Sequence, residues 1–196
     1  MCIRDRLKDV ATISSGVTIR EKVKHDPEGD THVIQMRDLI DHYPFINTES
    51  AALTKGDKFK PRHILAVGDL LFVAKGQNNF AYPIYSDLKD FKVVAVSFFF
   101  VIKKKPLPYD LESLYLGWYI NAPDAQRYFK KCSEGTNIRN INKKALEELP
   151  IPIPSVEMQK TIMATSDLLF KEEYFQKQLM EKRKQFITYS LLNKVR

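Results

Sequence analysis

The last part of the chain, from Ser155 to Arg196, contains neither glycine nor proline. It follows directly on the proline-rich stretch Leu149–Pro154 and is rich in Leu, Met, Glu, Lys and Gln, which all favour helices. This run predicts one continuous helix, whose length at 1.5 Å per residue is on the order of 60 Å. A small domain is only about half as wide. We therefore expect the helix to project and to need a partner along its length.

Short apolar runs bounded by turn residues predict β-strands in the first 154 residues. The longest apolar block, Val93–Ile102, is rich in β-branched and aromatic residues, so Val93–Lys103 is predicted as one buried strand with Phe98–Phe100 in the core. Met1–Arg6 shows no periodicity, so the sequence leaves open whether it belongs to the fold or is a frayed leader or a non-native extension. The other predicted strands are His32–Met36, Ile64–Val67, Leu70–Ala74 and a short one around Tyr82–Tyr85, with a tight turn at Gly68-Asp69.

Helical segments are predicted in three further places. Leu7–Ile13 is a short helical or extended opening. Two helices, Leu111–Ile120 and Asp124–Lys131, are separated by Pro123. Asn142 can cap a short helix that follows it, Lys143–Leu149. The sequence thus predicts an α+β protein, in which a small mixed-sheet domain over residues 1–154 precedes the long helix over residues 155–196.

Composition narrows the class of partner and the compartment. The formal net charge of +7 favours a polyanionic partner. Cys2 and Cys132 form neither a disulfide framework nor a metal-binding spacing, so we expect a reducing, cytoplasmic compartment. No apolar stretch approaches the ~18 residues of a membrane span, so no membrane association is predicted.

The residue patterns of enzymes are missing from the sequence. No glycines fall in the spacing of a dinucleotide or nucleotide-phosphate loop, so no cofactor is expected. Asp38, Asp41 and His42 form a small polar group, which we interpret as solvated acids rather than a catalytic site. The histidines are scattered singly, without the spacing of metal ligands, at positions His25, His32, His42 and His63. We predict neither a metal site nor catalytic residues.

Three loops combine glycine with amide and basic side chains: Ser14–Lys24, Lys75–Asn79 and Glu134–Lys144. Asn and Gln can pair with adenine edges and Arg with guanine edges, while Lys and backbone N–H groups hold phosphates. Three such loops in a basic chain predict DNA binding. The candidate DNA-binding residues are Thr18, Arg20, Lys22, Lys75, Gln77, Asn78, Asn79, Thr136, Asn137, Arg139 and Lys143.

Several motifs, in order, resemble those of one family. The segment Gly135–Ile162, with GTNI, then Leu146–Leu149, IPIP and SVEMQKTI, resembles the end of a target recognition domain in type I restriction-modification specificity subunits. LKDVATISSG (Leu7–Gly16) and VGDLLFVAKG (Val67–Gly76) resemble two earlier motifs of that family. Met158-Gln159 departs from the family's acidic-Gln pair. A full specificity subunit also has two recognition domains and two helices, whereas this chain has one of each.

The resemblance implies a half-length specificity subunit that does no chemistry itself. It would read a bipartite sequence in double-stranded DNA, carry methyltransferase subunits and, through them, the restriction subunit. An antiparallel helix pair in a homodimer would cover the apolar residues Ile162, Leu169, Phe175, Leu179 and Phe186, with Glu172 and Lys182 as polar interruptions. Such a dimer would read two inverted, identical half-sites. The alternatives are pairing with a second, non-identical half-subunit, a small nuclease or methyltransferase fragment, and a pure protein-assembly module.

Overall fold

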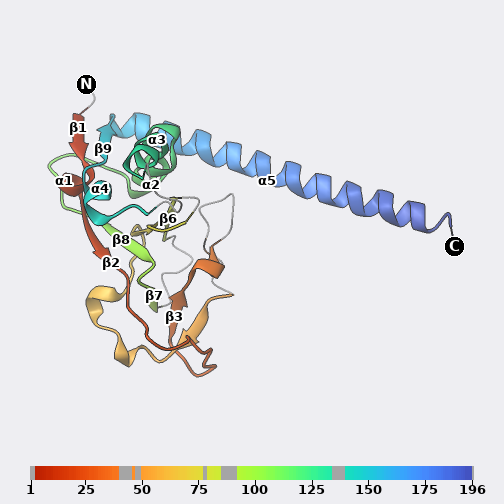
Figure 1. Cartoon of the computed structure of the whole chain (residues 1–196). Coiled ribbons are helices and arrows are strands. Elements are labelled where there is room, and N and C mark those ends of the chain that lie inside the picture. Colours follow the sequence, from red (N-terminus) through yellow and green to blue (C-terminus); the bar gives the residue numbers. More distant parts are fainter. Residues whose placement is uncertain are drawn as a thin grey trace. The chain divides into compact units, whose positions relative to one another are not determined.

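The computed structural model describes residues 3–39, 46, 50–76, 79–84, 92–133 and 140–195 (Figure 1). The chain divides into two compact units, Met1–Gln159 and Lys160–Arg196. The strands, all in the first unit, are β1 (Ile3–Arg6), β2 (Ala11–Ser15), β3 (Thr31–Ile34), β4 (Ala52–Thr54), β5 (Leu70–Val73), β6 (Ala81–Pro83), β7 (Lys92–Ala95), β8 (Phe99–Lys104) and β9 (Pro150–Ile153). The helices are α1 (Leu7–Val10), α2 (Ser113–Asn121), α3 (Pro123–Cys132), α4 (Lys143–Glu147) and α5 (Val156–Leu192), with 3-10 turns η1 (Met36–Asp38), η2 (Gly56–Lys58) and η3 (Pro61–His63). The predicted α+β class is confirmed.

Two sheets share the core of the first unit. The larger sheet has the strand order β2-β8-β5-β6 and is antiparallel throughout. The smaller sheet has the order β4-β3-β7, with β3 parallel to β7 and antiparallel to β4. Apolar side chains of both sheets belong to one buried cluster, which includes Ile34 and Val93 from the smaller sheet and Leu71 and Phe99 from the larger. Burial of this apolar surface is the main force that holds the sheets together.

The apolar block Val93–Lys103 is not one strand, and that prediction is wrong. It forms β7 and β8, which belong to different sheets and are joined by a turn at Ser97 and Phe98. The turn is closed by a hydrogen bond from the Phe99 N–H to the Val96 carbonyl (3.1 Å). Apolar residues continue on both sides because both strands face the same core, so the pattern concealed the turn. Phe98 lies on the turn with 57% of its surface exposed, which also corrects its predicted place in the core.

The predicted strand Ile64–Val67 is absent, whereas the turn after it is present. The Asp69 N–H donates to the Ala66 carbonyl (3.0 Å), and the Asp69 carboxylate accepts from the Ala66 N–H (2.8 Å). These bonds use groups that a strand would pair with a neighbour. The predicted turn at Gly68-Asp69 is confirmed, and the strand that follows it is β5.

The predicted helix boundaries are confirmed at two points. Pro123 follows α2 and lies in the first turn of α3, where a backbone N–H would have no hydrogen-bond partner within the helix. The Asn142 side chain caps α4 by accepting from the Ala145 N–H (2.8 Å). The Asn121 amide joins α2 to the larger sheet through both polar groups of Ala81, and the rings of Phe72 and Phe129 pack 5.1 Å apart. These contacts fix α2 and α3 on β5 and β6.

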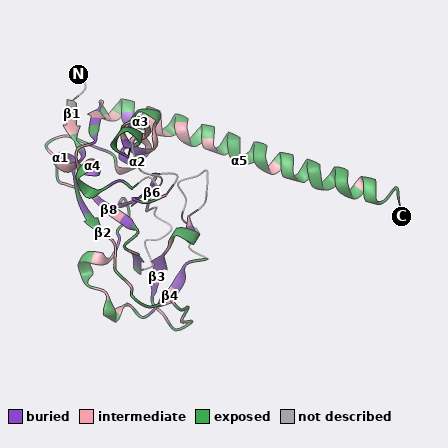
Figure 2. Cartoon of the chain, in the orientation of Figure 1, coloured by how far each residue is buried: buried purple, intermediate pink, exposed green. Residues whose placement is uncertain are grey.

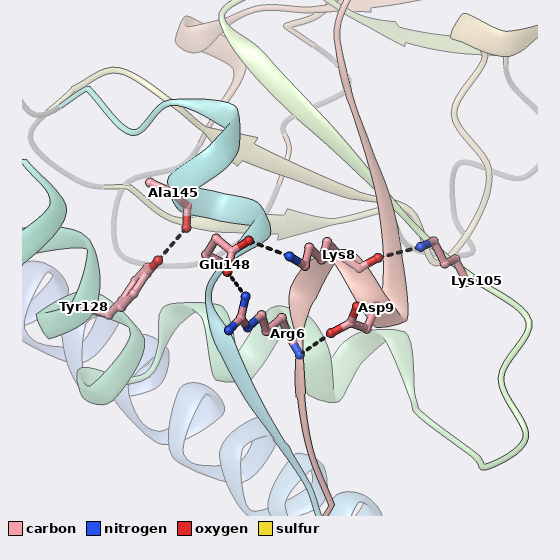
Figure 3. Close-up of polar contacts among 7 residues, drawn as sticks. All are labelled: Arg6, Lys8, Asp9, Lys105, Tyr128, Ala145 and Glu148. Carbon is pink, nitrogen blue, oxygen red and sulfur yellow. Dashed lines mark hydrogen bonds and ion pairs between the residues drawn. The ribbon is translucent and has the colours of Figure 1, made fainter.

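The beginning and the end of the first unit meet. β1 pairs antiparallel with β9, so Ile3 lies opposite Ile153. Ile3–Arg6 therefore belongs to the fold, which the sequence left open because the partner strand is distant and no local pattern reveals the pairing. Beside this pair, Glu148 binds both Arg6 and Lys8, the latter at 2.6 Å (Figure 3). The Lys105 ammonium group donates to the Lys8 carbonyl, and the Arg6 backbone N–H donates to the Asp9 carboxylate (Figure 3).

The predicted long helix is confirmed as α5. Its first turn belongs to the first unit through Gln159, which is fully buried. The Gln159 side chain accepts from the Glu112 N–H (2.9 Å) and donates to the carbonyls of Pro154 (2.9 Å) and Asp110 (3.1 Å). From Lys160 to Leu192, no described side chain is buried, whereas most residues of β3, β4 and β6 in the first unit are buried (Figure 2).

Candidate nucleic-acid interface

The strand register brings the first two polar loops to one edge of the larger sheet. Ser15, the last residue of β2, lies opposite Phe100 on β8. On the other side of β8, Phe99 lies opposite Val73, the last residue of β5. The loops that begin at Ser14 and at Lys75 therefore leave the sheet side by side.

The end of the third polar loop contacts the beginning of the second. Lys75 forms an antiparallel bridge with Asn140, and the Ile141 N–H donates to the Ala74 carbonyl (2.9 Å). Asn142 then caps α4, which begins with Lys143. Segments far apart in the sequence thus meet where β5 ends. The structure brings together the described ends of all three predicted loops.

The first loop is anchored at both ends. At its start, the Val17 N–H donates to the Ala95 carbonyl (2.7 Å), and the Ser97 N–H donates to the Val17 carbonyl (2.8 Å). A Cβ at Gly16 would lie 2.3 Å from the Val96 carbonyl oxygen, so only glycine allows this approach. At its end, the Asp26 N–H donates to the Leu53 carbonyl on β4 (3.0 Å). Exposed Thr18, Arg20 and Lys22 lie between these anchors.

The other predicted residues have three different placements. Lys75 and Lys143 are exposed, and Lys143 lies 3.5 Å from the Glu147 carboxylate. Asn79 is 1% exposed and its amide donates to the carbonyls of Val73 (3.0 Å) and Ala74 (3.3 Å), which argues against a DNA contact by this side chain. The predicted residues outside the described part of the chain are Gln77, Asn78, Thr136, Asn137 and Arg139.

Sequence reasoning missed two exposed features near these loops. Phe98 lies on the β7–β8 turn, beside the anchor of the first loop. The second feature is a run of exposed cations after β4, at Lys55, Lys58, Lys60 and Arg62. The density of lysine and arginine in TKGDKFKPRH was the signal that could have revealed it. It was missed because base-reading amides are absent there.

The polar group at Asp38 has a structural role. Asp38 is fully buried, so its interpretation as a solvated acid is wrong. Its carboxylate accepts from the Ser50 hydroxyl (2.9 Å) and the Gln35 N–H (2.8 Å), and it thereby closes η1. Asp41 and His42 lie outside the described residues. Among the residues that are described, no three His, Cys, Asp or Glu side chains are grouped to hold a metal ion.

The described helices include none with the length and apolar content needed to cross a membrane. α5 is long enough, but charged side chains occur throughout it.

Comparison with known proteins gives a consistent result. A family model described as "Type I restriction modification DNA specificity domain" matches residues 5–188. Among solved structures, the HsdS subunit from Thermoanaerobacter tengcongensis is 17% identical with a TM-score of 0.58, and the alignment covers 88% of this chain and 38% of that one. The type I restriction-modification S subunit from M. genitalium is 17% identical with a TM-score of 0.56, covering 86% and 38%.

A third structure, from work on complex assembly of a type I restriction-modification system, is 18% identical with a TM-score of 0.53, covering 87% and 38%. The chain thus spans 38% of the length of each of these three structures, and at these identities the likeness establishes a shared fold. No curated protein sequence matches the chain significantly.

Proposed function

Because the chain belongs to the family of type I restriction-modification DNA specificity domains, we propose that it recognises a specific sequence in double-stranded DNA. In this proposal it directs methyltransferase subunits, and through them a restriction subunit, to a bipartite target. The observation that carries the proposal is the meeting of three polar loops at one edge of the larger sheet. The protein would act in the cytoplasm, with the DNA that it reads, and would leave catalysis to its partners.

The proposed division of labour among the loops follows from side-chain chemistry. Exposed Lys22, Lys75 and Lys143 are suited to phosphates, since an ammonium group is a compact charge without base preference. Thr18 and Arg20 lie on the anchored first loop, where an arginine can read a guanine edge. The remaining proposed contacts to bases or phosphates are Gln77, Asn78, Thr136, Asn137 and Arg139.

The helix α5 supports a role in assembly. Most of its large apolar side chains are exposed, and at about 100° per residue nine apolar residues fall on two stripes about 120° apart, whereas Phe170, Tyr174 and Leu192 lie on neither stripe. The first stripe is Ile162, Leu169, Met180, Ile187 and Leu191. The second stripe is Leu168, Phe175, Leu179 and Phe186. The residues that sequence analysis placed on one stripe are therefore divided between two, and a helix with two apolar stripes needs two neighbours.

The second stripe is suited to pairing with itself. Its spacings are seven, four and seven residues, so it reads the same in both directions. An antiparallel pair would place Leu168 opposite Phe186 of the partner subunit and Phe175 opposite Leu179 of the partner subunit. The same register places Glu172 opposite Lys182 of the partner subunit, which joins opposite charges. We therefore propose a homodimer through a coiled-coil-like pair of α5 helices.

Self-pairing has consequences for both partners and target. One stripe would be covered by the second copy, and the other would remain for the methyltransferase subunits. The two recognition domains would be related by a two-fold axis, so their DNA target would consist of two inverted, identical half-sites. A second, non-identical half-subunit would instead give an asymmetric target.

Selection from a random duplex library tests the proposed function. The full chain, with and without a methyltransferase subunit, should enrich a recurring motif, with steep salt dependence. Binding without enrichment would contradict sequence recognition. Binding to the methyltransferase but to no DNA would favour a pure assembly module. DNA cleavage or methylation by the chain alone would favour an enzyme.

Two matched variants separate phosphate contacts from base contacts. Lys22→Ala should weaken binding to all duplexes alike. Asn137→Ala should instead relax the preference for particular bases by about 1–3 kcal/mol. An unchanged motif and affinity for Asn137→Ala would contradict the proposed place of the reading surface.

A further inference from the structure

The segment Lys55–His63, here called the basic segment, lies outside the three polar loops. It follows β4 and contains η2 and η3. Its four strong cations, Lys55, Lys58, Lys60 and Arg62, are exposed, and Asp57 is its one acidic residue. Among the described residues, no ion pair involves any of the four cations. Its positive charge is therefore available to a partner.

Asp30, which contacts the basic segment, and Asp69, which follows it in the sequence, are both already engaged. Asp30 accepts from Lys92 (2.6 Å) and from the Gly56 N–H (2.7 Å). The hydrogen bond from Lys92 is the largest of the effects that lower the pKa of Asp30 to about 2. Asp69 accepts from Lys103 (2.7 Å). These two acids form ion pairs with Lys92 and Lys103, not with the cations of the basic segment.

The basic segment is held at both ends. At its start, a Cβ on Gly56 would lie 2.2 Å from the Thr31 hydroxyl, so a larger residue would displace that buried side chain. At its end, Lys103 donates to the Ile64 carbonyl (3.1 Å), and the Leu65 N–H donates to the Val93 carbonyl (2.8 Å). Anchoring lowers the entropy that the segment would lose on binding.

The basic segment and the first polar loop both connect to β4, which Figure 2 labels. Asp26, at the end of the loop, binds Leu53 on β4, and the basic segment begins directly after that strand. Exposed cations of the loop, among them Lys22 and Lys24, therefore belong to the same region of the first unit. Repulsion between these like charges opposes the folded arrangement of this region, and a bound polyanion would relieve that repulsion.

We propose that the basic segment binds phosphates of duplex DNA and positions the recognition domain without reading bases. This inference rests on the proposed function and adds a second contact region to it. Duplex DNA is favoured over other polyanions because the segment is joined to a loop that already carries candidate base contacts. Phosphate contacts supply affinity and orientation, whereas sequence preference comes from groove contacts.

A triple variant of the full chain tests the inference: Lys58→Ala, Lys60→Ala and Arg62→Ala together. The matched control removes three exposed cations of α5 that lie on neither stripe, by Lys177→Ala, Arg183→Ala and Lys184→Ala. Affinity is measured over a range of salt concentrations, on a duplex with the selected motif and on an unrelated duplex. The triple variant should weaken binding to both duplexes by a similar factor. The slope of log affinity against log salt concentration should fall in magnitude by about one per cation that contacts phosphate. The control should leave the slope unchanged.

Three outcomes would overturn the inference. The first is an unchanged slope in the triple variant. The second is a loss confined to the selected motif, which would indicate base reading. The third is loss of affinity for heparin with no change on duplex DNA, which would indicate another polyanion.

Failure of the proposed function has a different signature, because it is read from the unaltered chain, which would then bind duplexes without enriching a motif or would bind no duplex at all. In the second case the inference would fall with it. Charge-conserving changes, Lys58→Arg, Lys60→Arg and Arg62→Lys, should retain the slope. Their failure to do so would contradict a role that depends on charge alone.

Discussion

The two compact units of this chain use apolar residues in opposite ways. In the first unit, the side chains of two sheets share a core in which Leu71 and Phe99 are fully buried. In the second, Phe175 and Phe186 are 65% and 71% exposed, and no described residue after Gln159 is buried. The first unit satisfies its own hydrophobic surface. The second leaves large apolar side chains exposed, as interaction surfaces do.

Polar groups show the same difference. Asn79, Asp38 and Gln159 are buried in the first unit, and each has hydrogen bonds to backbone groups. On α5, the ion pair Lys171–Asp167 joins neighbouring turns of one exposed helix. The recognition domain is therefore predicted to fold as specified by its own contacts, whereas the state of α5 is predicted to depend on concentration and partners.

The largest expected effect comes from one phenylalanine substitution in each unit. Phe99→Ala removes a fully buried ring and should reduce the free energy of unfolding of the first unit by about 3–5 kcal/mol. Phe186→Ala should leave that value within about 0.5 kcal/mol, because its ring is exposed. Denaturant unfolding followed by the fluorescence of Trp118, the one tryptophan, measures both. Equal losses for the two variants would remove the distinction between the units.

A smaller effect is expected where α5 enters the first unit. Gln159→Ala leaves the Glu112 N–H and two carbonyls without their partner, and should cost about 2–3 kcal/mol of unfolding free energy. Gln185→Ala, at an exposed position of the same helix, is the control and should be nearly neutral. If the two variants unfold alike, the first turn of α5 is not part of the folded recognition domain.

The smallest effect concerns the charges beside the second stripe. Glu172→Lys or Lys182→Glu alone places like charges opposite each other in the proposed pair and should weaken self-association by about 1 kcal/mol. The two changes together exchange the charges and should restore it. Sedimentation at several concentrations measures the dimer dissociation constants of the two single variants and the double variant, for comparison with that of the unaltered chain. Additive losses in the double variant would rule out the proposed register.

Local signals in the sequence predicted the helices well. The absence of glycine and proline after Ser155 predicts α5, because helix formation depends on neighbouring residues. The break at Pro123 and the cap at Asn142 are also local, and both were predicted. The strand pairing of Ile3–Arg6 was not predicted, because β9 lies at the other end of the first unit. The turn at Phe98 was concealed by apolar residues on both sides.

The candidate site was predictable in composition but not in arrangement. Polar loops are visible as amide and basic residues beside glycine, yet only the register of β2, β8 and β5 shows that they share an edge. Asn79 has the same residue type as the neighbouring Asn78, and only burial reveals its structural role. The basic segment was not predicted because it contains no amide side chain that could read a base. Whether a side chain faces solvent or core depends on tertiary contacts that no single loop encodes.

The central claim is that α5 is completed by a second copy of the chain, and sedimentation equilibrium of the purified protein tests it most directly. At tens of micromolar, the unaltered chain is expected to have twice its monomer mass of 22.8 kDa, if the second stripe pairs with itself as proposed. Leu179→Asp places a charge in the middle of that stripe and should return the protein to 22.8 kDa. A single-chain mass for both proteins, unaltered and variant, would contradict the claim.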